Sequence, residues 1–379
     1  MKQSFLIILL LCIWSCKKDP PSTASSTRLG DDTIIAPDQF KASKKQRNRE
    51  SASVAILKVN DLKRKVLDSP SDAKSHKQLS ELYGRMGQNK SALKHLRYAR
   101  SAKGLTQKEK VSLAQLYTEV NQASQAAVIY NGLIKQDPQN WRLRNDIANV
   151  YRKEKQYNKA LSIIEKILRA QKDNIFAMHT MSHIYADQKN FDMAELILQK
   201  ARKLNPKNAE TWNQIGILYQ AKGNHTQAQK AFLVATQKNP QLVEPKLNLA
   251  QYYITHHDHN NAVKIYSDIL QIEPLQLIAM YHLGVSSAAL GLEDEAHNKF
   301  SQLLQLAPEH QEGLFAMGIL NHYNMQDGQK ALKYYRKYIA LNPGLSSKHE
   351  VFNHMKRAEK MPPKIKPGTD NPSNGANKE

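Results

Sequence analysis

The sequence predicts an all-α protein, an α-solenoid of about eight helical hairpins with a capping helix at each end. A proline recurs at intervals of 34 or 68 residues, at Pro70, Pro138, Pro206, Pro240, Pro274 and Pro308. When each 34-residue unit begins three residues after these positions, alanine holds the twentieth place in seven successive units, from Ala92 to Ala296. Tyrosine holds the eleventh place in six, from Tyr83 to Tyr253. A fixed period of this length is typical of stacked helical repeats.

The units share an arrangement of small and large residues that favours two packed helices in each. The seventh place is always Leu, Ile or Met, and the eighth is always Ser, Ala or Gly. Small residues at places eight and twenty let two helices approach closely, while large residues at places seven, eleven and twenty-four fill the space between neighbours. The proline stops the second helix. The predicted units are residues 73–106, 107–140, 141–174, 175–208, 209–242, 243–276, 277–310 and 311–345.

This pattern resembles the tetratricopeptide repeat (TPR) family, over residues 73–345. The fifth unit carries the family's residues at Trp212, Gly216, Tyr219, Gly223, Ala228, Phe232 and Pro240. The resemblance implies a right-handed superhelix whose concave face is lined by the first helix of each pair. Two units depart from the pattern: the seventh has Ser287 at place eleven, and the eighth has Asn321 there and one inserted residue.

The repeats are flanked by segments of different composition. Residues 51–72 end in the same phase as a repeat and predict an N-terminal capping helix, and residues 346–361 predict a C-terminal one. Residues 362–379 are rich in Pro, Gly and Asn and predict a disordered tail. Residues 16–50 are rich in Pro, Ser, Thr and charge, and predict a disordered tether.

The first residues, MKQSFLIILLLCIWSC, predict a signal peptide over residues 1–15. The apolar stretch is too short to span a bilayer. Ile13, Ser15 and Cys16 resemble the lipobox of bacterial lipoproteins, whereas Trp14 departs from it. The resemblance implies lipidation of Cys16 and a lipid-anchored protein of the bacterial envelope. Lys17 after Cys16, rather than Asp, favours the outer membrane, facing the periplasm, if enterobacterial sorting applies. The alternative is an ordinary secreted protein with an incidental cysteine.

The net charge of +21 favours anionic partners and is concentrated in the N-terminal half. Residues 51–174 carry 24 Lys and Arg against 11 Asp and Glu, whereas residues 243–310 carry 3 against 8. This half is expected to lie against anionic lipid. Export would exclude nucleic acid as a partner, and no aromatic residues for base stacking are interleaved with the charge.

A protein or peptide partner is expected in the concave groove, where the TPR resemblance places polar side chains. Asn and Gln can bond both the N–H and the C=O groups of an extended peptide; the alternative is that these side chains are simply solvated. Glu210 argues against a clamp for a partner's carboxylate. Apolar residues in the seventh and eighth units suggest an aromatic or helical ligand there, unless the C-terminal helix covers them. The candidate groove residues are Arg142, Asn145, Asn149, Arg152, His179, His183, Glu210, Asn213, Gln214, Asn248, Gln251, Tyr281 and Phe315.

The sequence carries no catalytic motif and predicts neither an enzyme nor a cofactor. The only cysteines are Cys12 and Cys16, so the repeats hold no cysteine ligands for zinc. His256, His257 and His259 form a weak metal-site candidate at a turn of the sixth unit, and a coincidence of surface histidines is the more favoured interpretation.

These observations favour a membrane-anchored scaffold of the cell envelope that binds protein partners in its groove, such as an assembly factor for a pilus, secretion or cell-wall machine. Two alternatives stay open. One is a regulatory or carrier protein associated with peptidoglycan or glycan, and the other is an intracellular TPR chaperone adaptor.

Overall fold

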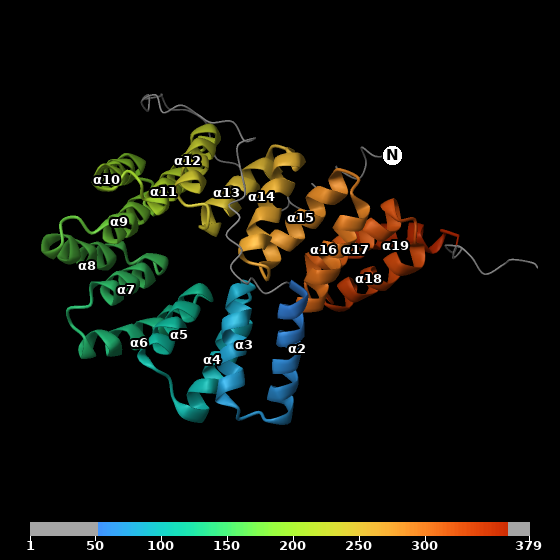
Figure 1. Cartoon of the computed structure of the whole chain (residues 1–379), viewed down its shortest axis with the longest axis horizontal. Coiled ribbons are helices and arrows are strands. Elements are labelled where there is room, and N and C mark those ends of the chain that lie inside the picture. Colours follow the sequence, from blue (N-terminus) through green and yellow to red (C-terminus); the bar gives the residue numbers. More distant parts are fainter. Residues whose placement is uncertain (1–51, 363–379) are drawn as a thin grey trace, which may run out of the picture. The chain divides into compact units, whose positions relative to one another are not determined.

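The computed structural model describes residues 52–362, which form helices, turns and no strand. Eight hairpins stack side by side in chain order (Figure 1). Their helices are α3 (Ala73–Arg85) and α4 (Asn89–Lys103), α5 (Gln107–Glu119) and α6 (Ala123–Gln136), α7 (Trp141–Lys153) and α8 (Tyr157–Ala170), α9 (Ile175–Asp187) and α10 (Phe191–Leu204), α11 (Ala209–Ala221) and α12 (His225–Lys238), α13 (Val243–Thr255) and α14 (His259–Ile272), α15 (Leu277–Ala289) and α16 (Glu293–Leu306), α17 (Gln311–Ile319) and α18 (Gly328–Ala340). The predicted all-α solenoid of about eight hairpins is confirmed.

Each predicted unit begins where a first helix begins, and asparagine sets several of these starts. The side chains of Asn140, Asn174 and Asn208 accept hydrogen bonds from the backbone N–H three residues ahead, at 3.3, 2.9 and 2.8 Å. Each bond satisfies an N–H group that a helix start leaves without an intrahelical partner. Thr106 caps α5 in the same way. The Glu109 carboxylate accepts a hydrogen bond from the Thr106 N–H, which completes a capping box.

The turn inside each of the first seven hairpins passes through one residue in the left-handed region, always at place fifteen. Glycine supplies this conformation without strain at Gly87, Gly223 and Gly291. In the other four units Asn121, Lys155, Lys189 and His257 adopt it, with φ between 58° and 63°. His257 of the candidate metal cluster is therefore the turn residue of the sixth hairpin.

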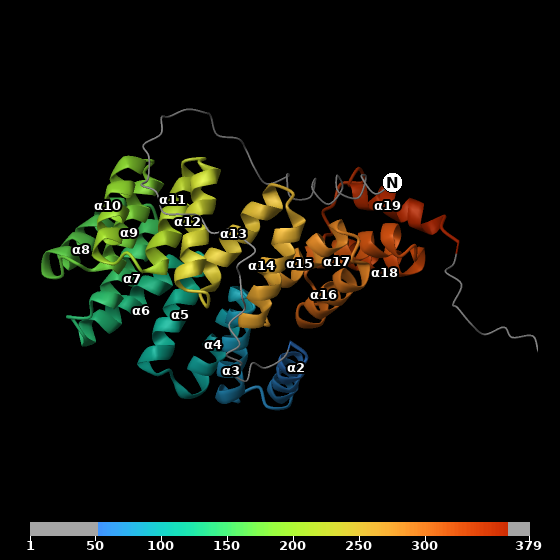
Figure 2. The same cartoon turned by 45° about the horizontal axis from the view of Figure 1, so that its top comes forward.

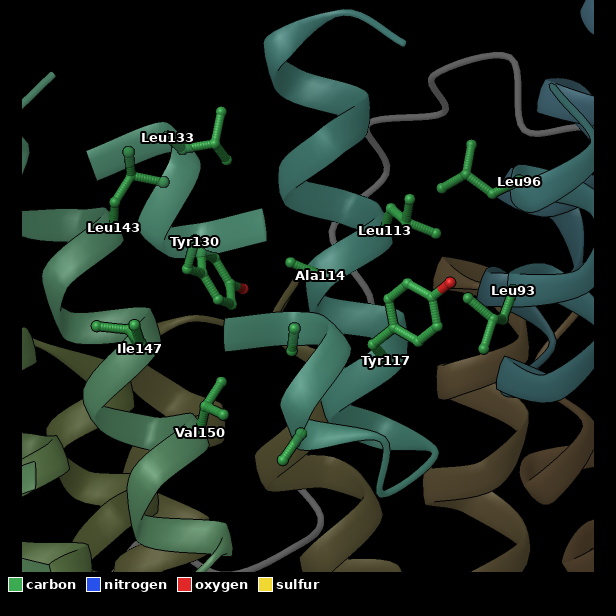
Figure 3. Close-up of a cluster of buried hydrophobic side chains, with 12 residues drawn as sticks. Leu93, Leu96, Leu113, Ala114, Tyr117, Tyr130, Leu133, Leu143, Ile147 and Val150 are labelled. Atoms are coloured by element: carbon green, nitrogen blue, oxygen red, sulfur yellow. The ribbon is translucent and has the colours of Figure 1, made fainter. Parts of the chain in front are cut away.

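The core repeats with the sequence period, because the small residue at place eight faces the large side chain at place twenty-four, which is a ring in the units with Gly216 and Gly284. A Cβ added to Gly216 would lie 2.4 Å from the Phe232 ring, and one added to Gly318 would lie 2.4 Å from the Tyr335 ring. Between the second and third units, Ala114 of α5 and Ile147 of α7 lie on either side of Tyr130 (Figure 3). Removal of this apolar area from water, about 25 cal/mol per Å², drives the stacking.

Capping helices lie at both ends of the stack. Helix α2 (Ala52–Asp68) packs on α3 and also contacts α16, and the two views of the chain place it beside that helix (Figures 1 and 2). Helix α19 (Glu350–Glu359) packs on α18 and buries Val351, His354 and Ala358. The predicted signal peptide, lipidation site, tether and tail lie outside residues 52–362.

The inserted residue of the eighth unit is absorbed in a π-helical turn, η2 (Leu320–Asn324), which directly follows α17. The Met325 N–H donates to the Leu320 carbonyl, 3.0 Å away and five residues back, instead of four. The π-turn moves the second helix of the hairpin one residue along the chain, so that Tyr335 still packs against Gly318.

Within residues 52–362, no helix combines the length and apolar character needed to cross a membrane.

Candidate partner-binding pocket

A pocket of about 510 Å³ opens between the first helices of the second to sixth hairpins. Eight of the thirteen predicted groove residues line it: Asn145, Asn149, Arg152, His179, His183, Glu210, Asn213 and Gln214. The remaining lining residues are Gln115, Thr118, Glu119, Tyr130, Asp146, Lys153, Phe176, Thr180, Leu242 and Glu244. Most of these come from α5, α7, α9 and α11, because parallel first helices of successive hairpins present the same places of the repeat to one face.

Hydrogen bonds between side chains join these first helices across the repeats. Asn149 Nδ2 donates to Thr180 Oγ1 at 3.3 Å, and the next step along the face pairs His183 Nε2 with Gln214 Oε1 at 2.6 Å. His179 Nε2 lies 2.9 Å from Thr211 Oγ1, in the buried layer directly beneath. The polar groove residues therefore bond one another as well as facing the pocket, which fixes their rotamers before any ligand binds.

The cations that line the pocket are already paired with carboxylates. Arg152 Nη1 lies 2.7 Å from Asp187 Oδ2, and its Nε donates to Asn149 Oδ1 at 3.4 Å. Lys153 Nζ lies 2.9 Å from Glu119 Oε1. Both ion pairs join adjacent first helices, so they strengthen the stack and leave little positive charge for a ligand.

The histidines of the pocket are neutral near pH 7. Burial lowers the pKa of His179 to about 4. Burial also lowers the pKa of His183, against a smaller opposite effect of the hydrogen bond that Gln214 Oε1 accepts from its ring. Neither imidazole adds positive charge to the pocket.

Asp146 is the carboxyl group with the most perturbed environment in the pocket. Burial raises its pKa to about 6. It makes no hydrogen bond or ion pair with any residue between 52 and 362, and Glu210 is likewise unpaired there. A carboxyl group with a shifted pKa in a concave site is a candidate functional group. The sequence pattern puts Asp146 on the groove face, but it does not reveal that this carboxylate is buried.

The five other predicted groove residues lie outside the pocket. The Arg142 guanidinium lies over the Trp141 ring at 5.2 Å, and Asn248 Nδ2 donates to Asn213 Oδ1 at 2.9 Å. Gln251 is half-buried on α13. Tyr281 packs against the rings of Phe300 and His310.

Phe315 requires a correction, because it is not an open groove residue. It is only 8% exposed and packs against the rings of Tyr338 and His354. Tyr323 and His354 share a hydrogen bond of 2.8 Å that ties η2 to α19. The apolar groove of the eighth hairpin is therefore covered by the C-terminal helix. This agrees with the second of the two sequence interpretations, in which that helix and not a ligand covers the apolar residues.

The histidines of the sixth unit do not converge on a common point. The His256 ring stacks on Tyr252 at 4.0 Å, and His259 is buried, with its centroid 6.4 Å from that of His257. Within residues 52–362, no group of three or more His, Cys, Asp or Glu side chains is arranged to hold a metal ion.

The described repeats form a helical solenoid with an open pocket, lined mostly by polar residues, in its row of first helices. Solenoids of this class work through bound partners. Three tetratricopeptide repeat family models match residues 113–181, 177–208 and 197–230. Residues 113–230 are therefore tetratricopeptide repeats, which are protein-interaction repeats. A comparison with curated protein sequences finds no match.

Several solved structures are similar to the chain. The APC/C hetero-tetramer Cut9–Hcn1 contains a chain that is 14% identical, with a TM-score of 0.48; the match covers 81% of this chain and 63% of that one. A tetratricopeptide repeat protein from Parabacteroides merdae is 14% identical, with a TM-score of 0.38 and coverage of 67% and 98%. YrrB, described as a TPR protein with an unusual peptide-binding site, is 18% identical, with a TM-score of 0.44 and coverage of 51% and 97%. The chain thus spans less than two thirds of the length of the first of these.

Proposed function

We propose that this protein is a lipid-anchored scaffold of the bacterial cell envelope that holds a peptide segment of a partner protein in the pocket between α5 and α13. The TPR fold makes it a protein-interaction scaffold, and the anchoring, the location and the pocket are the proposal. One observation carries it: the pocket, of about 510 Å³, is open and lined mostly by polar residues, whereas the apolar groove face of the eighth hairpin is covered. A pocket of this size accommodates a few residues of an extended peptide.

The pocket presents both an anchor and a bonding surface for such a segment. Phe176, at 48% exposed, lines the pocket beside Trp141, with ring centroids 5.9 Å apart. An exposed aromatic side chain next to polar groups is typical of interface centres. Asn145 Oδ1 is buried without a partner among residues 52–362, so a peptide N–H would satisfy it.

Photo-crosslinking in cells tests the pocket. A benzoylphenylalanine replaces Phe176, an aromatic residue whose side chain is exposed and lines the pocket. The matched control replaces Leu196, which is 59% exposed on the second helix of the same hairpin. We expect a discrete crosslinked protein from position 176 and none of that size from position 196. The same product from both positions, or from neither, would contradict a partner in the pocket.

The anchor is tested separately, because it depends on residues 1–50. Cys16→Ser should abolish incorporation of labelled palmitate and move the protein from the membrane to the soluble fraction, since a lipidated cysteine is the proposed attachment. Cys12→Ser is the control and should leave both unchanged. Membrane retention by the Cys16→Ser protein in low salt but not in high salt would instead indicate binding of the basic N-terminal half to anionic lipid.

A further inference from the structure

The pocket is acidic although the chain as a whole is strongly basic. Asp146, Glu210 and Glu244 line it without an ion-pair partner among residues 52–362. Lys153 is paired with Glu119 within the lining, and Arg152 with Asp187 outside it. The net charge of the protein is +21. A local reversal of sign inside a concave site concentrates ligands of the opposite charge there.

Tyr130 supplies an independent sign that the pocket is built for a ligand. Its side chain is only 1% exposed and lies between Ala114 of α5 and Ile147 of α7 (Figure 3). It lines the pocket from α6. Its hydroxyl has no hydrogen-bond partner among residues 52–362. The hydroxyl is not sealed inside the core, so an atom that enters the pocket can bond it.

Tyr130 also lies close enough to Asp146 for the two groups to influence each other. Burial, with the nearby carboxylates of Asp146 and Glu119, raises the pKa of Tyr130. Together with the unpartnered Asn145 Oδ1, the pocket therefore offers three oxygen acceptors without donors: a carboxylate, an amide oxygen and a phenol oxygen. A ligand that fits this set presents several N–H donors and a positive charge.

We propose that the pocket receives a lysine or arginine side chain from the partner's peptide segment, with the Asp146 carboxylate as its counter-ion and Tyr130 and Asn145 as further acceptors. The inference rests on the proposed function, because it specifies which side chain the bound segment contributes. A guanidinium or ammonium group forms charge-assisted bonds with a carboxylate, about twice as strong as neutral ones. Such a group also removes the unfavourable burial of an unpaired charge.

Other ligand chemistries fit the lining less well. A carboxylate or phosphate would meet Asp146, Glu210 and Glu244 with no unpaired cation to receive it. A divalent metal ion needs several converging ligands, and none of the described residues form such a group. A neutral amide would bond Asn145 but would leave the Asp146 charge uncompensated.

The surroundings of the pocket restrict the sequence around that basic side chain. Residues 51–174, which include the pocket-lining helices α5, α6 and α7, carry 24 Lys and Arg against 11 Asp and Glu. A highly basic peptide would be repelled before it reached the pocket. The segment that fits has an isolated Lys or Arg among neutral or acidic residues, so that its flanks match the basic exterior and its centre matches the acidic pocket.

A peptide-display selection on the full chain tests this inference. Peptides of about twelve residues, capped at both ends so that only side chains carry charge, are selected on the wild type and measured by fluorescence anisotropy. Each selected peptide is then remade with its Lys or Arg replaced by Gln. Both versions are measured on the wild type, on Asp146→Asn and on Asp173→Asn, whose exposed carboxyl lies in the loop after α8. Thermal unfolding verifies that each variant is folded.

We expect the peptide's basic residue to strengthen binding only when residue 146 is an aspartate. On the wild type and on Asp173→Asn, replacing the basic residue weakens binding by at least about tenfold; on Asp146→Asn the same change has less than about a twofold effect. Equal losses on all three proteins overturn the inference. Selected peptides that bind without any basic residue overturn it too and leave the proposed function standing, whereas a selection that yields no peptide overturns both. If a capped peptide of residues 41–50 (KASKKQRNRE) outcompetes every selected peptide, the occupant is the chain's own segment and not a partner.

Discussion

Two regions of the row of first helices differ in polarity: the covered C-terminal end and the open middle. In the eighth hairpin the groove face is apolar, and α19 covers it, leaving Phe315 and Ile319 8% and 1% exposed. From the second to the sixth hairpin the groove face is polar, its side chains bond one another across the repeats, and the pocket stays open. An apolar groove face is stable in water only when it is covered. A polar face whose side chains bond one another is stable while it is open to a ligand.

The largest expected effect comes from breaking the covered end. Val351→Asp places a carboxylate at a side chain of 0% exposure. We expect a loss of about 3–5 kcal/mol in unfolding free energy, or separation of α19 from the hairpin with increased binding of a hydrophobic dye. Urea unfolding and dye fluorescence measure both. Asn353→Asp makes the same change of charge at an exposed position of α19 and should leave both readings unchanged. An equal effect of the two variants would mean that α19 does not cover an apolar face.

Acidification should weaken the covered end, because His354 is buried there as a neutral imidazole. Burial, helped by His322 and Arg357, lowers its pKa from 6.5 to about 4. The unfolded chain therefore binds a proton at a higher pH than the folded one does. The stability is fully present above pH 6.5 and is lost as the pH falls toward 4, by about 2 kcal/mol for this residue at pH 5.

The measurement compares urea unfolding at pH 7.5 and pH 5. His354→Gln keeps a hydrogen-bond acceptor for Tyr323 but cannot take up a proton, so this variant should lose about 2 kcal/mol less than the wild type over that range. His256→Gln removes an exposed imidazole and should behave as the wild type does. A wild type whose stability does not change between the two pH values would contradict the buried neutral imidazole.

The contribution of Asp146, in the open region, to the unfolding free energy should change with pH in the opposite direction. Burial raises the pKa of this carboxyl to about 6, from 3.8, so its charged form is unfavourable in the folded state above that pH. Asp146→Asn should therefore raise the unfolding free energy at pH 8 by about 1–2 kcal/mol, after allowance for partial solvent screening, and by less at pH 5. Urea unfolding measures this, with Asp173→Asn as the neutral control. A destabilised Asp146→Asn protein would show instead that the carboxylate holds the fold together.

The repeating part of this fold was predictable from the sequence, and the contacts that break the repeat were not. Ala114, Gly216 and Phe232 could be assigned to the core because each place recurs in units with the same environment. The asparagine caps at Asn140, Asn174 and Asn208 carry the same period and could have been found in the same way.

The candidate site was predictable only in outline. The groove places followed from the TPR resemblance, and the structure gathers eight of those residues into one pocket. The role of Tyr130 did not follow, because place twenty-four belongs to the core elsewhere and its hydroxyl reaches the pocket only through the packing of α6 behind α7. Phe315 was placed wrongly among the open residues because its cover comes from α19, which lies outside the repeat and docks by tertiary contact alone.

The smallest expected effect concerns the ion pairs that hold the polar wall in place. Arg152 and Asp187 lie 2.7 Å apart on adjacent first helices, but Asp187 is 38% exposed, so solvent screens the attraction. A double-mutant cycle with Arg152→Gln and Asp187→Asn should give a coupling of about 0.5–1 kcal/mol in unfolding free energy, falling with added salt. Asp187→Asn alone should also add positive charge to the pocket, because it leaves the Arg152 guanidinium without its carboxylate partner. The affinity for a basic peptide should then fall modestly, whereas Arg152→Gln should not lower it. A coupling near zero, with no effect of Asp187→Asn on peptide binding, would show that this ion pair does not stabilise the polar face. The hydrogen bonds between the side chains would then be what orders it.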